Sequence, residues 1–272
     1  KGARLCVLPE LCLGGAELSA YSWASAREQA AAFDRLARLA SDLDVTVVCG
    51  LVRADGAVRR NSQICLTPGG VAGVYDKRAL VLHEHAGARP GEHPAIFSTP
   101  LGSIGAGICK DLLYPELFAP YAGRVDLVCV SSAWPVFEGR PLAIGGLGRQ
   151  LTDWIDELPG RVAALVGAPV VYCNAWGGPH DILGIGPATR VRMAGRSRIV
   201  TPGGETLGRA EDGEAIVVAD VALCREPPRS ETASWRGDGL AARVGALETL
   251  LCRGVDRAQR WLGAGSPWRS AR

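Results

Sequence analysis

The sequence of 272 residues lacks the features that would place it in several large classes of protein. It has no apolar run as long as a membrane span, and its N-terminus lacks the charged-then-apolar layout of a secretion signal. Its 30 basic and 28 acidic residues nearly balance, and no basic stripe stands out, which argues against a nucleic-acid-binding surface. Because 47% of the residues are apolar, the composition excludes a disordered chain and predicts a globular protein with a sizeable core.

The nine cysteines include no Cys-x-x-Cys pair, and their number is odd. Most of them lie inside apolar runs, which is typical of reduced, buried thiols rather than of a disulfide framework. We therefore predict a cytoplasmic protein in which eight cysteines are buried thiols and one has a chemical role.

Lysine is scarce, since only Lys1, Lys77 and Lys110 occur among the 30 basic residues. An internal lysine in such an arginine-rich chain indicates a place where a compact, titratable ammonium is needed. Chance explains either internal lysine equally well when it is considered alone.

Short apolar runs alternate with amphipathic segments, so the sequence predicts an α/β fold with a largely buried sheet. A Thr-Pro-Gly-Gly turn at 67–70 recurs in a hairpin at 197–208, which suggests two similar halves. The expected strands are 4–8, 45–51, 61–66, 70–75, 103–109, 127–132 and 169–174, and the expected helices are 24–42, 114–121 and 149–165.

The end of the chain has a different pattern. Residues 225–234 are rich in proline and charge and indicate a linker, and apolar residues at helical spacing follow over 240–262. This amphipathic helix packs either on its own domain or on a partner subunit, and the pattern favours neither. We therefore divide the chain into a domain at 1–224 and a C-terminal linker and helix at 225–272.

Glu10, Lys77 and Cys109 each lie at the C-terminal end of an expected strand. Ligands of α/β sheets bind beyond such ends, so the three side chains can converge on one site. A cysteine thiol needs a nearby base or cation to become a nucleophile, and a carboxylate and an ammonium supply both. The alternatives are that Cys109 fills the core, that Glu10 caps a turn and that Lys77 is an exposed strand end.

Several motifs in the same order resemble those of the nitrilase superfamily, the carbon–nitrogen hydrolases. The segment 2–15 resembles the Pro-Glu motif of that family, and 61–80 resembles its Tyr-x-Lys motif. The likeness runs from residue 2 to about residue 222. The stretch GSIGAGICKDLLYPE at 102–116 resembles the nucleophile motif through Gly105, Cys109, Asp111, Pro115 and Glu116.

The resemblance implies a four-layer α-β-β-α sandwich and the hydrolysis of a small amide or N-carbamoyl compound through a cysteine thioester. Cys109 would be the nucleophile and Glu10 the general base and acid, while Lys77 and the backbone N–H of Lys110 would hold the oxyanion. Glu84 falls where the family has a second glutamate, and it would orient the substrate or Lys77. The family needs no cofactor or metal, and its members associate through helices, so we expect a homodimer or a higher homo-oligomer.

Lys110, Trp134 and Asn174 are the expected substrate-binding residues, because they follow the nucleophile or the ends of strands. Trp134 and Asn174 fit a packing role equally well, as does Trp176. The run His83-Glu84-His85 contains residue types that bind metals, but alternate residues of a strand point to opposite faces and no third ligand is evident. We predict no metal.

Two departures from the family pattern leave questions open. Only nine residues precede Glu10, so the N-terminal strand and helix of the family are absent and we expect a truncated chain with an exposed strand edge. Lys110 stands where amidases often have an aromatic residue, true nitrilases a tryptophan and some carbamoyl hydrolases an asparagine. The alternatives are therefore a nitrilase acting on a small nitrile, an acyl-transferring member and a non-catalytic binding protein.

Overall fold

The computed structural model describes residues 2–15, 18–81, 83–136, 147–181, 190–211 and 213–228. The expected helix at 240–262 and most of the expected linker lie outside these ranges. No helix among the described residues is long and apolar enough to cross a membrane.

Four strands form what we call the N-terminal sheet, in the order β1-β2-β3-β4. β1 runs parallel to β2, whereas β2, β3 and β4 are antiparallel neighbours. β1 is an edge strand of this sheet. The strands are β1 (Leu5–Val7), β2 (Thr46–Asp55), β3 (Val58–Thr67) and β4 (Gly70–Asp76).

Six strands form the C-terminal sheet, in the order β13-β12-β9-β7-β6-β5. Its centre is parallel, from β6 through β7 to β9. All six residues of β7 are buried, as expected for a parallel strand that is covered on both faces. The strands are β5 (Ile96–Thr99), β6 (Gly102–Ile108), β7 (Leu127–Ser132), β9 (Val170–Asn174), β12 (Arg198–Val200) and β13 (Thr206–Arg209).

A small third sheet of order β10-β11-β8 extends beyond the end of β7. Its strands are β8 (Pro135–Val136), β10 (Trp176–Asp181) and β11 (Arg190–Ala194).

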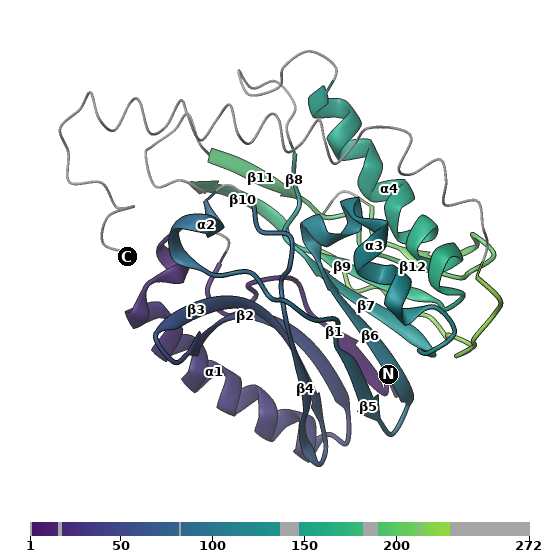
Figure 1. The fold of residues 1–272 in the computed structure, drawn as a ribbon, viewed down its shortest axis with the longest axis horizontal. Helices are drawn as coiled ribbons and strands as arrows, with labels where there is room; N and C mark the ends of the chain where they lie inside the picture. The colour runs from purple at the N-terminus through teal and green to yellow at the C-terminus, as the bar shows by residue number, and fades with distance from the viewer. Residues whose placement is uncertain are drawn as a thin grey trace.

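The helices cover the outer faces of the two large sheets (Figure 1). α1 (Trp23–Asp42) packs on β2 and β3, and Ser22 caps it by accepting a hydrogen bond from the Ser25 N–H. α4 (Leu147–Val166) and the short α3 (Pro115–Phe118) lie on the C-terminal sheet. These are the four layers of the predicted α-β-β-α sandwich, which is thereby confirmed.

The core lies between the two sheets and beneath the helices. Val48 and Cys65 point into the space between the sheets, and their neighbours Val47 and Ile64 pack under α1 instead. This division follows from the two-residue period of a strand. Phe97 of β5 bridges the sheets, and a Cβ atom on Gly73 of β4 would lie 2.6 Å from its ring, so glycine is needed there.

Most of the expected elements occur within a few residues of their expected bounds, and the structure adds strands β5, β8, β10 and β11, which the sequence did not predict. The expected helix at 114–121 ends after Phe118 and continues as the 3-10 turn η3 (Ala119–Tyr121), because Pro120 has no N–H for a helical hydrogen bond. Residues 84–87 form a short helix, α2 (Glu84–Gly87), and Cys109 follows β6 instead of ending it.

The two Thr-Pro-Gly-Gly turns occupy matching places, since one joins β3 to β4 and the other joins β12 to β13. Each large sheet therefore carries one such hairpin. The expectation for the cysteines is wrong in part: all eight described cysteines are free thiols, but Cys6 and Cys12 are exposed. Cys6 lies on the edge strand β1 and Cys12 in the turn that follows it.

Candidate active site

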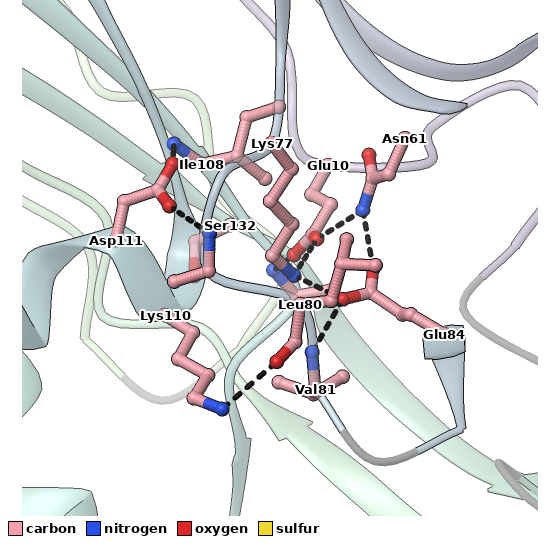
Figure 2. A network of polar contacts seen from close by, with 12 residues as sticks. Glu10, Asn61, Lys77, Leu80, Val81, Glu84, Ile108, Lys110, Asp111 and Ser132 are labelled. Atoms are coloured by element: carbon pink, nitrogen blue, oxygen red, sulfur yellow. Dashed lines mark hydrogen bonds and ion pairs between the residues drawn. The ribbon is translucent and has the colours of Figure 1, made fainter. Parts of the chain in front are cut away.

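Glu10, Lys77 and Glu84 meet in the interior of the protein (Figure 2). Glu10 follows β1, Lys77 comes directly after β4, and Glu84 is the first residue of α2. The Lys77 ammonium lies 2.7 Å from Glu10 Oε1 and 2.9 Å from Glu84 Oε2, and all three side chains are buried. Burial disfavours the charge on Lys77, but the two carboxylates raise its pKa well above the ordinary value. Lys77 is therefore an ammonium at neutral pH.

Glu84 accepts hydrogen bonds from three further donors. The Tyr21 hydroxyl donates to Oε1 at 2.6 Å, Asn61 Nδ2 donates to the same oxygen at 2.5 Å, and the Val81 N–H donates to Oε2 at 2.7 Å. Burial by itself would raise the pKa of Glu84, but the charge of Lys77, then that of His83, and the hydrogen bonds from Tyr21 and Val81 hold it well below its ordinary value. Glu84 is thus a carboxylate at neutral pH and a charged partner of Lys77.

The helical start at Glu84 corrects the strand geometry assumed for His83, Glu84 and His85 in the sequence-based argument about a metal. The Glu84 carboxylate is directed to Lys77. Among the described residues, no three His, Cys, Asp or Glu side chains form a cluster that could hold a metal ion.

Glu10 is held from two sides. Its Oε1 accepts from Lys77 and from Asn61 Nδ2, each at 2.7 Å, and its Oε2 accepts from the Ala133 N–H at 2.8 Å. The backbone of Glu10 lies so close to β2 that a Cβ atom on Gly50 would be 2.7 Å from its Cα. Glycine at position 50 therefore allows the approach that places the carboxylate.

Cys109 begins the 3-10 turn η2 (Cys109–Leu113) with a left-handed φ of 45°, which is strained for a residue with a side chain. Ser132 and the backbone of Ala133 favour its thiolate form, as does the charge of Lys77, whereas the charge of Glu10 opposes it. Burial, and then the Glu10 carboxylate, raise the pKa of Cys109 to about 12, and Lys77 only partly offsets this. The resting group is a neutral thiol, so a base must take its proton as it reacts.

Asp111 holds the turn that carries Cys109. Its Oδ2 accepts from the Ile108 N–H at 2.9 Å and from the Tyr75 hydroxyl at 2.8 Å, and its Oδ1 accepts from the Ala79 N–H at 2.9 Å. Burial raises the pKa of Asp111 to about 6. This carboxylate therefore connects the turn after β6 to the loop after Lys77.

The three expected substrate-binding residues have different surroundings. Lys110 Nζ donates to the Leu80 carbonyl at 2.8 Å and lies on the side of the loop away from Glu84 (Figure 2). Trp134 is buried, and its Nε1 has no hydrogen-bond partner among the residues that the structure describes. Asn174 accepts from the Trp134 N–H at 2.7 Å and donates to the Gly195 carbonyl at 2.8 Å, which ties two loops together. Trp176 is exposed.

Three residues of the network escaped the sequence-based argument: Tyr21, Asn61 and Ser132. Ser132 had a usable signal, because it follows the apolar residues 127–130 of β7. Asn61 had none, because it lies among the polar residues 59–63 of β3. Tyr21 had none either, since it ends the 3-10 turn η1 (Leu18–Tyr21) and reaches Glu84 across 63 positions of sequence.

Comparisons with known proteins agree with this geometry. The family model for carbon–nitrogen hydrolases matches residues 1–226. The chain belongs to the carbon–nitrogen hydrolase family. The chloroplastic omega-amidase of Arabidopsis thaliana is 32% identical over 133 residues, which are 48% of this chain and 30% of that protein. A probable nitrilase of Schizosaccharomyces pombe is 24% identical over 79% of this chain and 74% of its own length.

Solved structures of an amidase from Nesterenkonia sp. AN1 have a similar fold. The complex of a cysteine-to-alanine mutant with butyramide has a TM-score of 0.67 and 26% identity, and covers 81% of this chain and 78% of that one. A glutamate-to-glutamine mutant, with the acetamide moiety of fluoroacetamide added covalently at the active-site cysteine, gives a TM-score of 0.67 and 25% identity over the same shares. This family of carbon–nitrogen hydrolases thus includes amidases of the same architecture.

Proposed function

We propose that the chain hydrolyses the C–N bond of a small amide or N-carbamoyl compound, with Cys109 as nucleophile. The observation that carries the proposal is the meeting of one thiol, one ammonium and two carboxylates that come from four separate segments of the chain. The family membership and the similar amidase structures support the same reaction.

In the first half of the proposed reaction, the Cys109 sulfur attacks the carbonyl carbon and Glu10 takes the thiol proton. A base is required because the resting thiol is neutral. The carbonyl oxygen becomes an oxyanion, which Lys77 and the backbone N–H of Lys110 stabilise. The C–N bond then breaks as Glu10 returns the proton to the leaving nitrogen, which departs as ammonia or an amine.

In the second half, water hydrolyses the resulting thioester. Glu10, again a carboxylate, takes a proton from the water as its oxygen adds to the carbonyl carbon. The C–S bond then breaks as Glu10 returns this proton to the sulfur, so the thiol is regenerated and the carboxylic acid is released. Glu84 keeps Lys77 in place throughout, since its own partners hold it as a carboxylate.

The surroundings of Lys110, Trp134 and Asn174 suggest separate contributions to substrate binding. The buried indole N–H of Trp134, which has no partner within the described ranges of the chain, would donate to a substrate oxygen. The Asn174 amide is engaged with the backbone of Trp134, so it would act by positioning that residue. For Lys110 we propose that the side chain fixes the Leu80 loop, while its N–H faces the reacting carbonyl.

The test is a panel of small aliphatic amides, ω-amides of dicarboxylic acids and N-carbamoyl compounds, assayed for ammonia with the Cys109→Ala variant as the blank. We expect ammonia release from at least one amide and a thioester adduct on Cys109 by intact-mass measurement after rapid quenching. No release and no adduct with any compound would favour a non-catalytic binding protein.

A nitrile substrate is the second candidate, because the match to a probable nitrilase covers more of the chain than the match to the omega-amidase. Small nitriles therefore belong in the same panel. Adding hydroxylamine or another amine tests for acyl transfer, since a thioester that is passed to the amine gives a new amide in place of the acid. The expected homo-oligomer stays a prediction that light scattering can test.

A further inference from the structure

Asn61 joins the two carboxylates of the site. It is the fourth residue of β3 and is fully buried, and its Nδ2 donates to Glu10 Oε1 at 2.7 Å and to Glu84 Oε1 at 2.5 Å. We propose that Asn61 is a positioning residue that keeps Glu10 and Glu84 as two separate carboxylates, so that Glu10 stays able to accept a proton. The inference rests on the proposed function, because that function makes Glu10 the base.

The charges of the cluster require a second set of donors besides Lys77. Two carboxylates share one ammonium, so the buried group of three keeps a net negative charge. Like charges this close favour protonation of one of them, which would remove either the base or the partner of Lys77. The two N–H bonds of one amide nitrogen reach one oxygen of each carboxylate and oppose that protonation (Figure 2).

An amide suits this place better than other donors. A hydroxyl has one proton and could serve only one carboxylate, whereas a second ammonium would neutralise the cluster and weaken Glu10 as a base. The oxygen of the same amide shows that the N–H donors decide its orientation. Asn61 Oδ1 is buried without a hydrogen-bond partner in the described part of the chain, and such an oxygen costs stability. Flipping the amide would be worse, because it would place that oxygen against both carboxylates.

Four titratable groups face the two carboxylates: Lys77 after β4, Tyr21 before α1, His83 before α2 and Cys109 after β6. Lys77 contacts Oε1 of Glu10 but Oε2 of Glu84, whereas Asn61 contacts Oε1 of both. Without Asn61, the described residues leave one donor at each of these oxygens: the Tyr21 hydroxyl at Glu84 Oε1 and the Lys77 ammonium at Glu10 Oε1. The pair would then take up a proton at higher pH.

The experiment measures two pH profiles for Asn61→Leu, which removes both donors at similar size, and for Asn61→Asp, which adds a charge at the same shape. The first profile is the rate of Cys109 alkylation by iodoacetamide, followed at the level of the peptide by mass spectrometry. The second is kcat/KM for the best amide of the panel. In Asn61→Leu we expect the acid limb of both profiles to shift to higher pH by about one unit, which is a ten-fold lower rate at a given pH on that limb. The shift should be larger in Asn61→Asp.

Gln63→Leu is the matched control. Gln63 is a buried amide two residues along β3, and its Nε2 donates to the Gly107 carbonyl and to Ser131 Oγ and not to the carboxylates. This variant should lose thermal stability, because it removes a buried amide and its hydrogen bonds. The acid limbs of its two pH profiles should stay where they are in the unmodified chain. Asn61→Ser keeps one donor, so its acid limb should move by less than that of Asn61→Leu. It also provides the measurement if Asn61→Leu does not fold.

The outcomes separate the two proposals. A displaced limb in the alkylation profile without hydrolysis of any amide would overturn the proposed function and leave the role of Asn61 standing. Hydrolysis by the unmodified chain, with both limbs unmoved in folded Asn61 variants, would overturn the role of Asn61 alone. A limb that moves equally in Gln63→Leu would also overturn it, because the shift would then come from a general loosening of the fold.

Discussion

The two sheets hold their parts of the candidate site by different means. The N-terminal sheet and its loops supply charged and amide side chains, namely Glu10, Asn61 and Lys77, that hold one another through direct hydrogen bonds. The C-terminal sheet supplies the thiol and the groups around it, and there the backbone sets the geometry: Cys109 has a left-handed φ, and the Ala133 N–H donates to Glu10 and lowers the pKa of Cys109. The N-terminal part of the site, which we call the charged side, therefore depends on hydrogen bonds between side chains. The part around Cys109, which we call the nucleophile side, depends on backbone geometry and close packing.

The largest effect should come from the charged side, in Glu10→Gln. Removing the base should lower kcat/KM by roughly 100- to 10,000-fold, the range that general acid–base catalysis contributes. The acid limb that alkylation of Cys109 owes to Glu10 as the base should be absent from the same variant. The remaining alkylation should follow the ionisation of the thiol alone, with a pKa that is lower because the Glu10 carboxylate no longer raises it. Hydrolysis and alkylation by iodoacetamide, measured on one preparation, test both effects. Equal losses of both at every pH would show that Glu10 supports the fold and is not the base.

Lys77→Arg should have the next largest effect. A planar guanidinium does not fit between two carboxylates that lie 2.7 and 2.9 Å from one nitrogen, and it would present a different geometry to the oxyanion. We expect a loss of about 100- to 1000-fold in kcat, as for other oxyanion donors. Lys77→Met is the control, because it should be at least as inactive and also less stable, since it leaves Glu10 and Glu84 without their ammonium. A Lys77→Arg variant within a few fold of normal kcat would contradict the role in the transition state.

Asp111→Asn tests the link between the two sides. It should reduce kcat by a smaller factor, on the order of 10-fold, because the amide places an N–H group against at least one of the three groups that donate to the Asp111 carboxylate. It should also change stability in a defined way. The pKa of Asp111 is raised to about 6, so the folded chain binds this proton more tightly than the unfolded chain does. Its contribution to stability is therefore present at low pH and lost as the pH rises from about 4 to about 6. In Asp111→Asn that loss should vanish, which urea unfolding across this pH range can measure.

Most of the fold and the central residues of the site could be predicted from local patterns. The alternation of apolar runs located the strands, and the ends of those strands pointed to Glu10, Lys77 and Cys109. The helix at Glu84 was missed because four residues are too few to show a helical period. The exposure of Cys6 and Cys12 was missed because the cysteines were assigned together from their apolar runs. An exposed strand edge was expected at this end of the chain, and it explains the exposure of Cys6, while Cys12 lies in the turn that follows β1.

Asn61 and Tyr21 were missed for a different reason, since their roles exist only after folding brings them to Glu84 from 23 and 63 positions away. Asn174 shows the opposite case. Its place at the end of a strand suggested either contact with substrate or packing, and its amide is engaged with the backbone of Trp134 and Gly195, so its part in binding stays a prediction. The position of a residue relative to a strand therefore predicts where it lies better than what it touches.

The smallest expected effect tests the close packing on the nucleophile side. Gly107 lies on β6 two residues before Cys109, and a Cβ atom there would be 2.7 Å from the Phe118 ring of α3. Gly107→Ala should therefore destabilise the protein by about 1–3 kcal/mol through overpacking, with a smaller loss of activity from the displaced turn. Gly160→Ala is the matched control, because Gly160 lies inside α4 with open space around its Cβ position and should gain up to about 1 kcal/mol. Thermal unfolding of both variants decides the point: if Gly107→Ala is as stable as Gly160→Ala, close packing of β6 on α3 does not hold the turn of Cys109.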